Sequence, residues 1–236
     1  MATTLVLSLL IAAAASGGDA RGEWIELLAG ENFRAWREPR GQWMMVDNAA
    51  TDPADARRLA WTPGTRVAIN GPQGRTVNLI TAQEFGDVEA HIEFMIPKGS
   101  NSGVYFMGRY EIQIFDSHGV AKDKYPGIEC GGIYPRWIDN QNVGGRSPRV
   151  NASLPPGQWQ AFDVVFRAPR FDSAGKKTKN AEFVRVVHNG QVIHENVEVD
   201  GPTRAALFDD ERPTGPLMLQ GDHGPVAYRN VRLRGL

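Results

Sequence analysis

The chain has few of the features that stabilise small secreted scaffolds or bind polyanions. Cys130 is the only cysteine among 236 residues, so no intramolecular disulfide can form. The 26 basic and 27 acidic residues leave a formal net charge of −1. Such a balance provides no electrostatic footprint for nucleic acid or for an anionic membrane, and neither is expected as a partner.

Long hydrophobic runs are also scarce. The N-terminus, MATTLVLSLLIAAAASGGDARG, holds an apolar run of about a dozen residues, too short to span a bilayer, followed by small residues. This pattern predicts a signal peptide over residues 1–20, cleaved between Ala15 and Ala20. The mature protein is then periplasmic or secreted and free of the membrane. The alternative is that the run forms a buried first strand.

Sustained helical periodicity is missing as well. Short β-like runs alternate with Gly, Pro, Asn and Asp clusters, which predicts an all-β fold, a two-sheet antiparallel jelly-roll sandwich, as a single domain over residues 21–236. Besides the hairpin described next, the predicted strands are Trp24–Leu28, Trp43–Asp47, Thr76–Thr81, Val88–Ile96, Gln158–Arg167, Phe183–His188, Gln191–Val197, Gly215–Gln220 and Ala227–Leu233.

The most informative segment is NSGVYFMGRYEIQIFDSH, residues 101–118. It predicts a hairpin of two strands, Val104–Met107 and Tyr110–Phe115, with Gly108 and Arg109 as the turn. Planar and ionisable side chains crowd these eighteen residues, and no lysine occurs among them. Such a concentration of hydrogen-bonding groups suggests a carbohydrate ligand.

Strand alternation places Glu111 and Gln113 about 7 Å apart on one face, while Ile112 and Ile114 point into the core. Asn101 and Arg109 flank the two polar residues. The simpler interpretation is a solvated outer face of an antiparallel sheet.

Two further segments carry candidate chemistry. In LQGDHGPVAYRNVRL, Gln220, Asp222 and His223 close one strand and Arg229 belongs to the next. A histidine between Asp and Gly suits acid–base chemistry or metal ligation, although a turn histidine without a task fits equally. The long loop 122–156 contains aromatic residues such as Tyr134, which either stack on a sugar ring or pin the loop down.

The segment VRVVHNGQVIHENVEV predicts a hairpin with Asn189 and Gly190 in a type I′ turn. Its histidines, His188 and His194, are interpreted as cross-strand surface residues and are assigned no chemistry. Residues Ala168–Ala181 are predicted to form a mobile surface loop.

The order of motifs from Trp24 to Leu236 resembles the 3-keto-disaccharide hydrolase family. The matching pieces are G-x-W, N-L-I-T-x-x-x-F-G-D-x-E, N-S-G-V-Y-F, Y-E-I-Q-I-F-D, G-G-I-Y, a second G-x-W, the N-G hairpin and L-Q-x-x-H-G-x-V-x-Y-R-N-V. The resemblance implies a concanavalin A-like or laminin-G-like jelly roll. The chain departs from the family in its opening, LLAGENFRAW, and in the Asp222–His223 pair.

The resemblance also implies a substrate already oxidised to a ketone at sugar carbon 3. The ketone acidifies the proton at carbon 2, so one base can form an enolate that expels the group at carbon 1. Glu111 or His223 is the candidate base. The residues expected to position the substrate are Asn101, Arg109, Gln113, Tyr134, Gln220 and Arg229.

Ordinary glycosidases on this fold use two carboxylates, whereas Gln113 stands beside Glu111 here. Asp116 and Glu129 remain alternatives for a second acid. No cofactor is certain; a divalent metal held by Glu111, His118 and His223 is a hypothesis. Two other functions stay open, a non-catalytic carbohydrate-binding module and a hydrolase of unmodified glycans.

Overall fold

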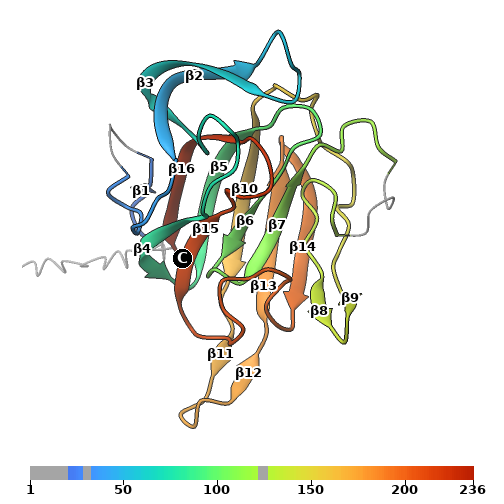
Figure 1. The fold of residues 1–236 in the computed structure, drawn as a ribbon. Coiled ribbons are helices and arrows are strands. Elements are labelled where there is room, and N and C mark those ends of the chain that lie inside the picture. The colour runs from blue at the N-terminus through green and yellow to red at the C-terminus, as the bar shows by residue number, and fades with distance from the viewer. Residues whose placement is uncertain (1–20, 29–32, 122–126) are drawn as a thin grey trace, which may run out of the picture.

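Two antiparallel β-sheets face each other in the computed structural model, which describes residues 21–28, 33–121 and 127–236 (Figure 1). The predicted signal peptide lies outside the described residues. Every strand pairing within them is antiparallel, and they contain no helix, so no helix there could cross a membrane. The prediction of an all-β two-sheet sandwich is confirmed.

The larger sheet has eight strands. Its order is β14 (Gln191–Val199), β13 (Ala181–His188), β10 (Gln160–Arg167), β5 (Val88–Met95), β16 (Ala227–Gly235), β3 (Leu59–Ile69) and β2 (Met44–Thr51), with β1 (Ile25–Glu26) paired to β16.

The smaller sheet carries the candidate site. Its order is β4 (Leu79–Phe85), β15 (Gly215–Leu219), β6 (Asn101–Phe106) and β7 (Tyr110–Phe115). Residues around Ile133 continue it beyond β7 through a bridge to Ile112. Two short hairpins project from the sandwich, β8 (Arg136–Ile138) with β9 (Gln141–Val143), and β11 (Arg170–Phe171) with β12 (Lys177–Lys179).

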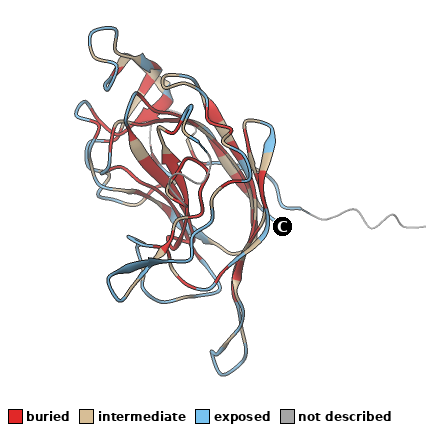
Figure 2. Cartoon of the chain, turned by 90° about the vertical axis from the view of Figure 1, so that its right-hand side faces the viewer, coloured by how far each residue is buried: buried red, intermediate tan, exposed pale blue. Residues whose placement is uncertain are grey.

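The core fills the space between the sheets, where buried residues gather in Figure 2. Aromatic rings join the two layers: Phe106 of β6 meets Phe183 of β13 edge-on at 5.5 Å between centroids and Phe166 of β10 at 5.2 Å. Ile112 and Ile114 of β7 are fully buried in this cluster. The opposite face of the smaller sheet is therefore free to present polar side chains.

Sequence patterns missed strand β3 and both short hairpins. Pro63 and Gly64 inside β3 resemble loop residues, but the register shifts opposite Val46, and the bulge accommodates them. At Gly64 a Cβ atom would lie 2.6 Å from the Asp47 Cα, so the close approach of the two strands needs glycine. The segment predicted to be a mobile surface loop at Ala168–Ala181 holds the β11–β12 hairpin.

The hairpin at Asn189 and Gly190 is confirmed, with φ angles of 51° and 79°. The surface assignment of its histidines is wrong. Both histidines are buried. His188 forms a hydrogen bond with the Gln160 side chain, and His194 forms one with the Gly131 carbonyl. Burial lowers the pKa of His188 to about 3 and that of His194 to about 4, so both are neutral inside the fold.

The β6–β7 hairpin turns one residue earlier than predicted. Met107 and Gly108 both have positive φ angles, and the pairing starts at Phe106 with Tyr110, so the loop has three residues. As a result Tyr105 lies opposite Glu111 rather than opposite Ile112. A shift of one residue exchanges the two faces of a strand, and here it brings Tyr105 onto the polar face.

Candidate functional site

A cavity of about 240 Å³ opens on the face of the smaller sheet that points away from the core. Strands β6 and β7 and the end of β15 supply its floor, and the segment after β7 and the loop before β15 supply its walls. The residues that line it are Asn101, Tyr105, Glu111, Gln113, Tyr134, Arg204, Ala205, Gln220 and His223. Six of these nine were predicted as site residues from the sequence.

Glu111 is the one carboxylate among these lining residues and is only 1% exposed. The absence of a side chain at Gly103, on the neighbouring strand, makes room for it. A Cβ atom at Gly103 would lie 2.1 Å from Glu111 Oε1, far inside van der Waals contact. The glycine of the N-S-G-V-Y-F motif is therefore part of the site's geometry.

Burial, with a smaller contribution from the negative charge of Asp222, raises the pKa of Glu111 to about 8. A hydrogen bond from the Tyr105 hydroxyl opposes these effects. Glu111 Oε2 has no hydrogen-bond partner within the protein. The carboxyl group is consequently mostly protonated at neutral pH and is a stronger base than an exposed carboxylate once it ionises.

Amide and phenol groups surround the carboxylate. The Gln220 amide donates to the Tyr105 hydroxyl at 3.3 Å, which orients the tyrosine beside Glu111. Gln113 Oε1 accepts from the Ile114 backbone at 3.0 Å. Asn101 Oδ1 is buried without a partner, as is Glu111 Oε2. The pocket therefore offers two acceptor atoms that no protein donor satisfies.

His223 and Arg204 supply the other ionisable groups of the pocket. Asp222 Oδ1 lies 2.6 Å from His223 Nδ1, which fixes the imidazole and favours a proton on that nitrogen. Burial raises the pKa of Tyr134, and the Glu111 charge adds to this effect. The positive charge of Arg204 opposes both, but the pKa stays above its ordinary value. The arrangement combines one buried base, one oriented imidazole and one permanent positive charge.

Two predicted substrate-binding residues lie elsewhere. Arg109 is buried below the turn, where its guanidinium contacts Asp210 and the Met107 carbonyl and lies 4.4 Å from the Phe208 ring centroid. Arg229 belongs to the larger sheet, where it pairs with Glu93 at 2.6 Å and stacks on Trp159. Both guanidinium groups are held by protein partners and line no part of this pocket.

The three metal candidates do not converge. His118 Nδ1 bonds to the Ser153 carbonyl at 2.9 Å, and His118 does not line the pocket that Glu111 and His223 share. In the described ranges, no group of three or more His, Cys, Asp or Glu side chains is arranged to hold a metal ion. The prediction that Glu111, His118 and His223 share a metal ion is therefore wrong.

The sequence also missed pocket residues. Tyr105 was not singled out within its predicted strand, and its pairing with Glu111 places it in the pocket. Arg204 and Ala205 come from the loop before β15. No local sequence pattern indicates that this loop packs against β7. It is fixed there because the Thr203 amide donates to the Arg109 carbonyl at 2.8 Å and the Glu111 amide donates to the Thr203 hydroxyl.

Comparisons with known proteins bear on the fold and the family of this chain. Residues 23–234 match the family model described as 3-keto-alpha-glucoside-1,2-lyase-like domain. Three solved structures of candidate glycosyl hydrolases from Parabacteroides distasonis are similar. The first has a TM-score of 0.65 at 25% identity over 90% of this chain and 84% of the other. The second has 0.59 at 20% over 91% and 100%, and the third 0.54 at 16% over 90% and 94%. No curated protein matches the chain.

Proposed function

The chain belongs to the family of 3-keto-alpha-glucoside-1,2-lyase-like domains, and on this premise we propose that it cleaves 3-keto-glycosides by base-assisted elimination, with Glu111 as the base. The family and its structural neighbours indicate a carbohydrate-active domain. The particular substrate and the role of each side chain are the proposal.

The observation that carries the proposal is the unpartnered oxygen of the Glu111 carboxylate. A buried acceptor without a donor costs free energy, typically about 1–3 kcal/mol and more for a charged group. Glu111 Oε2 and Asn101 Oδ1 both bear this cost at the floor of one pocket. Sugar hydroxyl groups are the donors that would satisfy them, and a carboxylate oxygen free of protein donors, such as Glu111 Oε2, can accept a proton from carbon.

In the proposed reaction, Glu111 removes the proton from carbon 2. The electron pair of that C–H bond delocalises into the carbon 3 ketone as an enolate. When the enolate collapses, a double bond forms between carbons 1 and 2 and the carbon 1 to oxygen bond breaks. The departing oxygen takes its proton from solvent water, and His223, held by Asp222, orients that water through its other ring nitrogen. Arg204 and the Tyr134 hydroxyl stabilise the negative oxygen at carbon 3.

The geometry does not favour the mechanism of ordinary glycosidases. A retaining enzyme holds two carboxyl groups about 5–5.5 Å apart, on either side of the bond that breaks. Asp116 accepts a hydrogen bond from the Gly99 amide, and neither it nor Glu129 lines the pocket. Asp222 is engaged with His223. An elimination needs one base rather than two acids, which matches the groups present.

The substrate class is tested by incubating the protein with 3-keto-glucosides and, in parallel, with their unoxidised parents, followed by NMR. We expect the oxidised compounds alone to be cleaved, and a 2-hydroxy enone to appear before any free 3-keto sugar. Cleavage of the parents alone would overturn the proposal in favour of a conventional hydrolase. Binding of both sets without cleavage would identify a carbohydrate-binding module instead.

A further inference from the structure

The pocket is smaller than its expected substrates. Its volume of about 240 Å³ lies below the ~300–1,000 Å³ that drug-sized ligands occupy. One sugar ring fills a cavity of this size, so the group attached at carbon 1 must lie outside it. The surface beside the pocket then decides which glycosides bind well.

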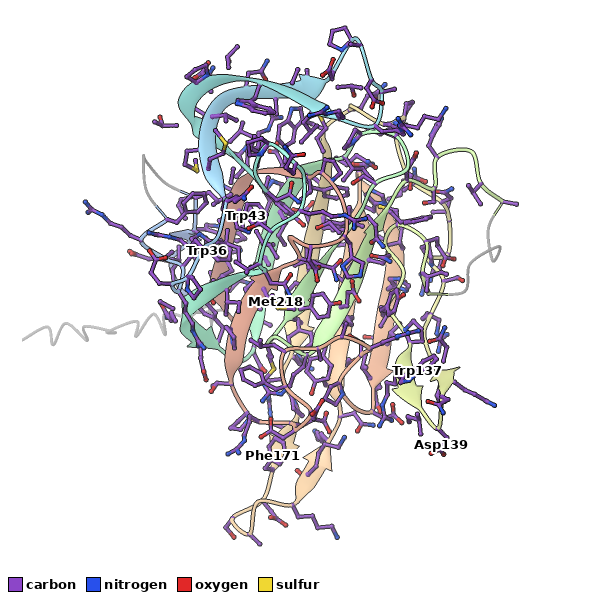
Figure 3. The ribbon with its side chains drawn as sticks, viewed as in Figure 1. Trp36, Trp43, Trp137, Asp139, Phe171 and Met218 are labelled. Atoms are coloured by element: carbon purple, nitrogen blue, oxygen red, sulfur yellow. The ribbon has the colours of Figure 1, made fainter. Side chains whose placement is uncertain are left out.

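One exposed aromatic residue stands at that position. Trp137 is 45% exposed, whereas the other five tryptophans of the chain are buried or half-buried. It lies on the β8–β9 hairpin, whose tip at Asp139 extends beyond the sandwich (Figure 3). Neither strand of this hairpin contributes a buried residue, so a large apolar ring there adds little to the core.

Arg204 connects this tryptophan to the pocket. Its guanidinium carbon lies 3.8 Å from the centroid of the Trp137 ring, within the range of a cation–π contact, and the same side chain lines the pocket. The two residues therefore form a continuous surface from the cavity to the hairpin. Asn142, paired with Trp137 across the hairpin, shares its face.

Backbone contacts hold this surface in place. The Arg204 amide donates to the Pro135 carbonyl at 2.9 Å, and Arg136 pairs with Asp200 at 2.9 Å. Ala205 has a φ of 61°, a left-handed conformation that costs free energy for a residue with a Cβ atom. Such strain at a pocket wall is typical of a segment kept for binding geometry rather than for stability.

We infer that Trp137 and Arg204 form an aglycone platform, on which a cyclic group at carbon 1 of the substrate stacks while the oxidised sugar ring occupies the pocket. The inference rests on the proposed function for the identity of that sugar ring. The platform selects glycosides with a flat-faced aglycone, either a second sugar or an aromatic group, over those with a small alkyl group. Arg204 and Asn142 supply donors for hydroxyl groups on the aglycone's edge.

The test compares three substrates, methyl 3-keto-glucoside, phenyl 3-keto-glucoside and a 3-keto-disaccharide. W137A should lower kcat/KM for the phenyl compound or the disaccharide by roughly three- to tenfold and leave the methyl compound within about twofold. The substrate with the larger loss identifies the aglycone class. W137F should retain most of the preference. V143A is the matched control because Val143 is similarly exposed on the opposite face of the hairpin.

An equal loss on all three substrates, or no loss on any, would overturn the platform. A second measurement separates this result from failure of the proposed chemistry. Isothermal titration of E111Q and of E111Q/W137A with methyl and phenyl glucosides needs no turnover. A weaker affinity of the double variant for the phenyl glucoside alone supports the platform even if no 3-keto-glycoside is cleaved. Equal affinities would reject it.

Discussion

Arg109 and Glu111 are two residues apart, both nearly excluded from solvent, and their environments are opposite. Arg109 is satisfied by the Asp210 carboxylate, two backbone carbonyls and the Phe208 ring. Glu111 keeps one oxygen without a partner and a pKa raised to about 8. A buried charge that is fully paired serves the fold, whereas one left unpaired at a pocket floor is a candidate for chemistry. Substitutions at the two positions should therefore have opposite effects.

The largest expected effect is the loss of turnover in E111Q. Glutamine keeps the shape of the side chain but cannot accept the carbon 2 proton, and general-base catalysis is typically worth about 10²–10⁴-fold. We expect kcat on a 3-keto-glucoside to fall by that factor, while the affinity for the unoxidised glucoside, measured by calorimetry, stays within a few fold. Retention of full turnover would remove Glu111 from the mechanism.

R109M should do the reverse. Methionine preserves the bulk of the stem but leaves the Met107 and Asp210 carbonyl groups without their donor. We expect the free energy of unfolding, measured by urea denaturation, to fall by about 2–4 kcal/mol. Activity per folded molecule should stay within a few fold, because Arg109 lines no part of the pocket. A selective loss of activity without destabilisation would reinstate Arg109 as a substrate ligand.

G103A tests the space that the carboxylate occupies. The added methyl group would meet Glu111 Oε1 at 2.1 Å, so the carboxylate must move, and misplacement by about 1 Å can cost on the order of 100-fold in rate. G235A is the matched control because its methyl group would meet nothing within 4 Å. Equal activities of the two variants would show that the site tolerates a displaced carboxylate.

A further prediction concerns the stability of E111Q. In the folded protein Glu111 has a pKa of about 8 against 4.5 for an ordinary glutamate, so the folded state retains its proton longer than the unfolded state. The wild-type free energy of unfolding then falls as pH rises from 4.5 to 8, by about 1.4 kcal/mol per pH unit from this group. E111Q should lack that decline and become the more stable protein toward pH 8. Parallel denaturation profiles would contradict the raised pKa.

The sequence predicted the fold well because the signals of a sandwich are local. The alternation of apolar and polar residues correctly separated Ile112 and Ile114 from Glu111 and Gln113. The Asn189–Gly190 pair was sufficient to predict the turn that it forms. It failed where long-range packing decides the outcome. From the sequence His188 resembles a surface residue, because nothing nearby in the chain shows that Gln160 forms a hydrogen bond with it in the core.

The candidate site was predicted in part for the same reason. The site residues on the β6–β7 hairpin and after β15 were found because they lie on predicted strands or directly after one. Arg109 and Arg229 were misplaced because an arginine in a polar segment gives no indication of the partner that binds it. Arg204 was missed because only the tertiary fold brings its loop against β7.

The pH dependence of kcat/KM for a 3-keto-glucoside, measured in the wild type and in E111Q, tests the role of Glu111 most directly. If Glu111 is the base, the wild-type rate rises with pH as the carboxyl group ionises and levels off above an apparent pKa of about 8. The residual activity of E111Q should lack this transition. A wild-type rate that falls through the same range, or an identical profile in E111Q, would contradict the assignment of the buried carboxylate as the base.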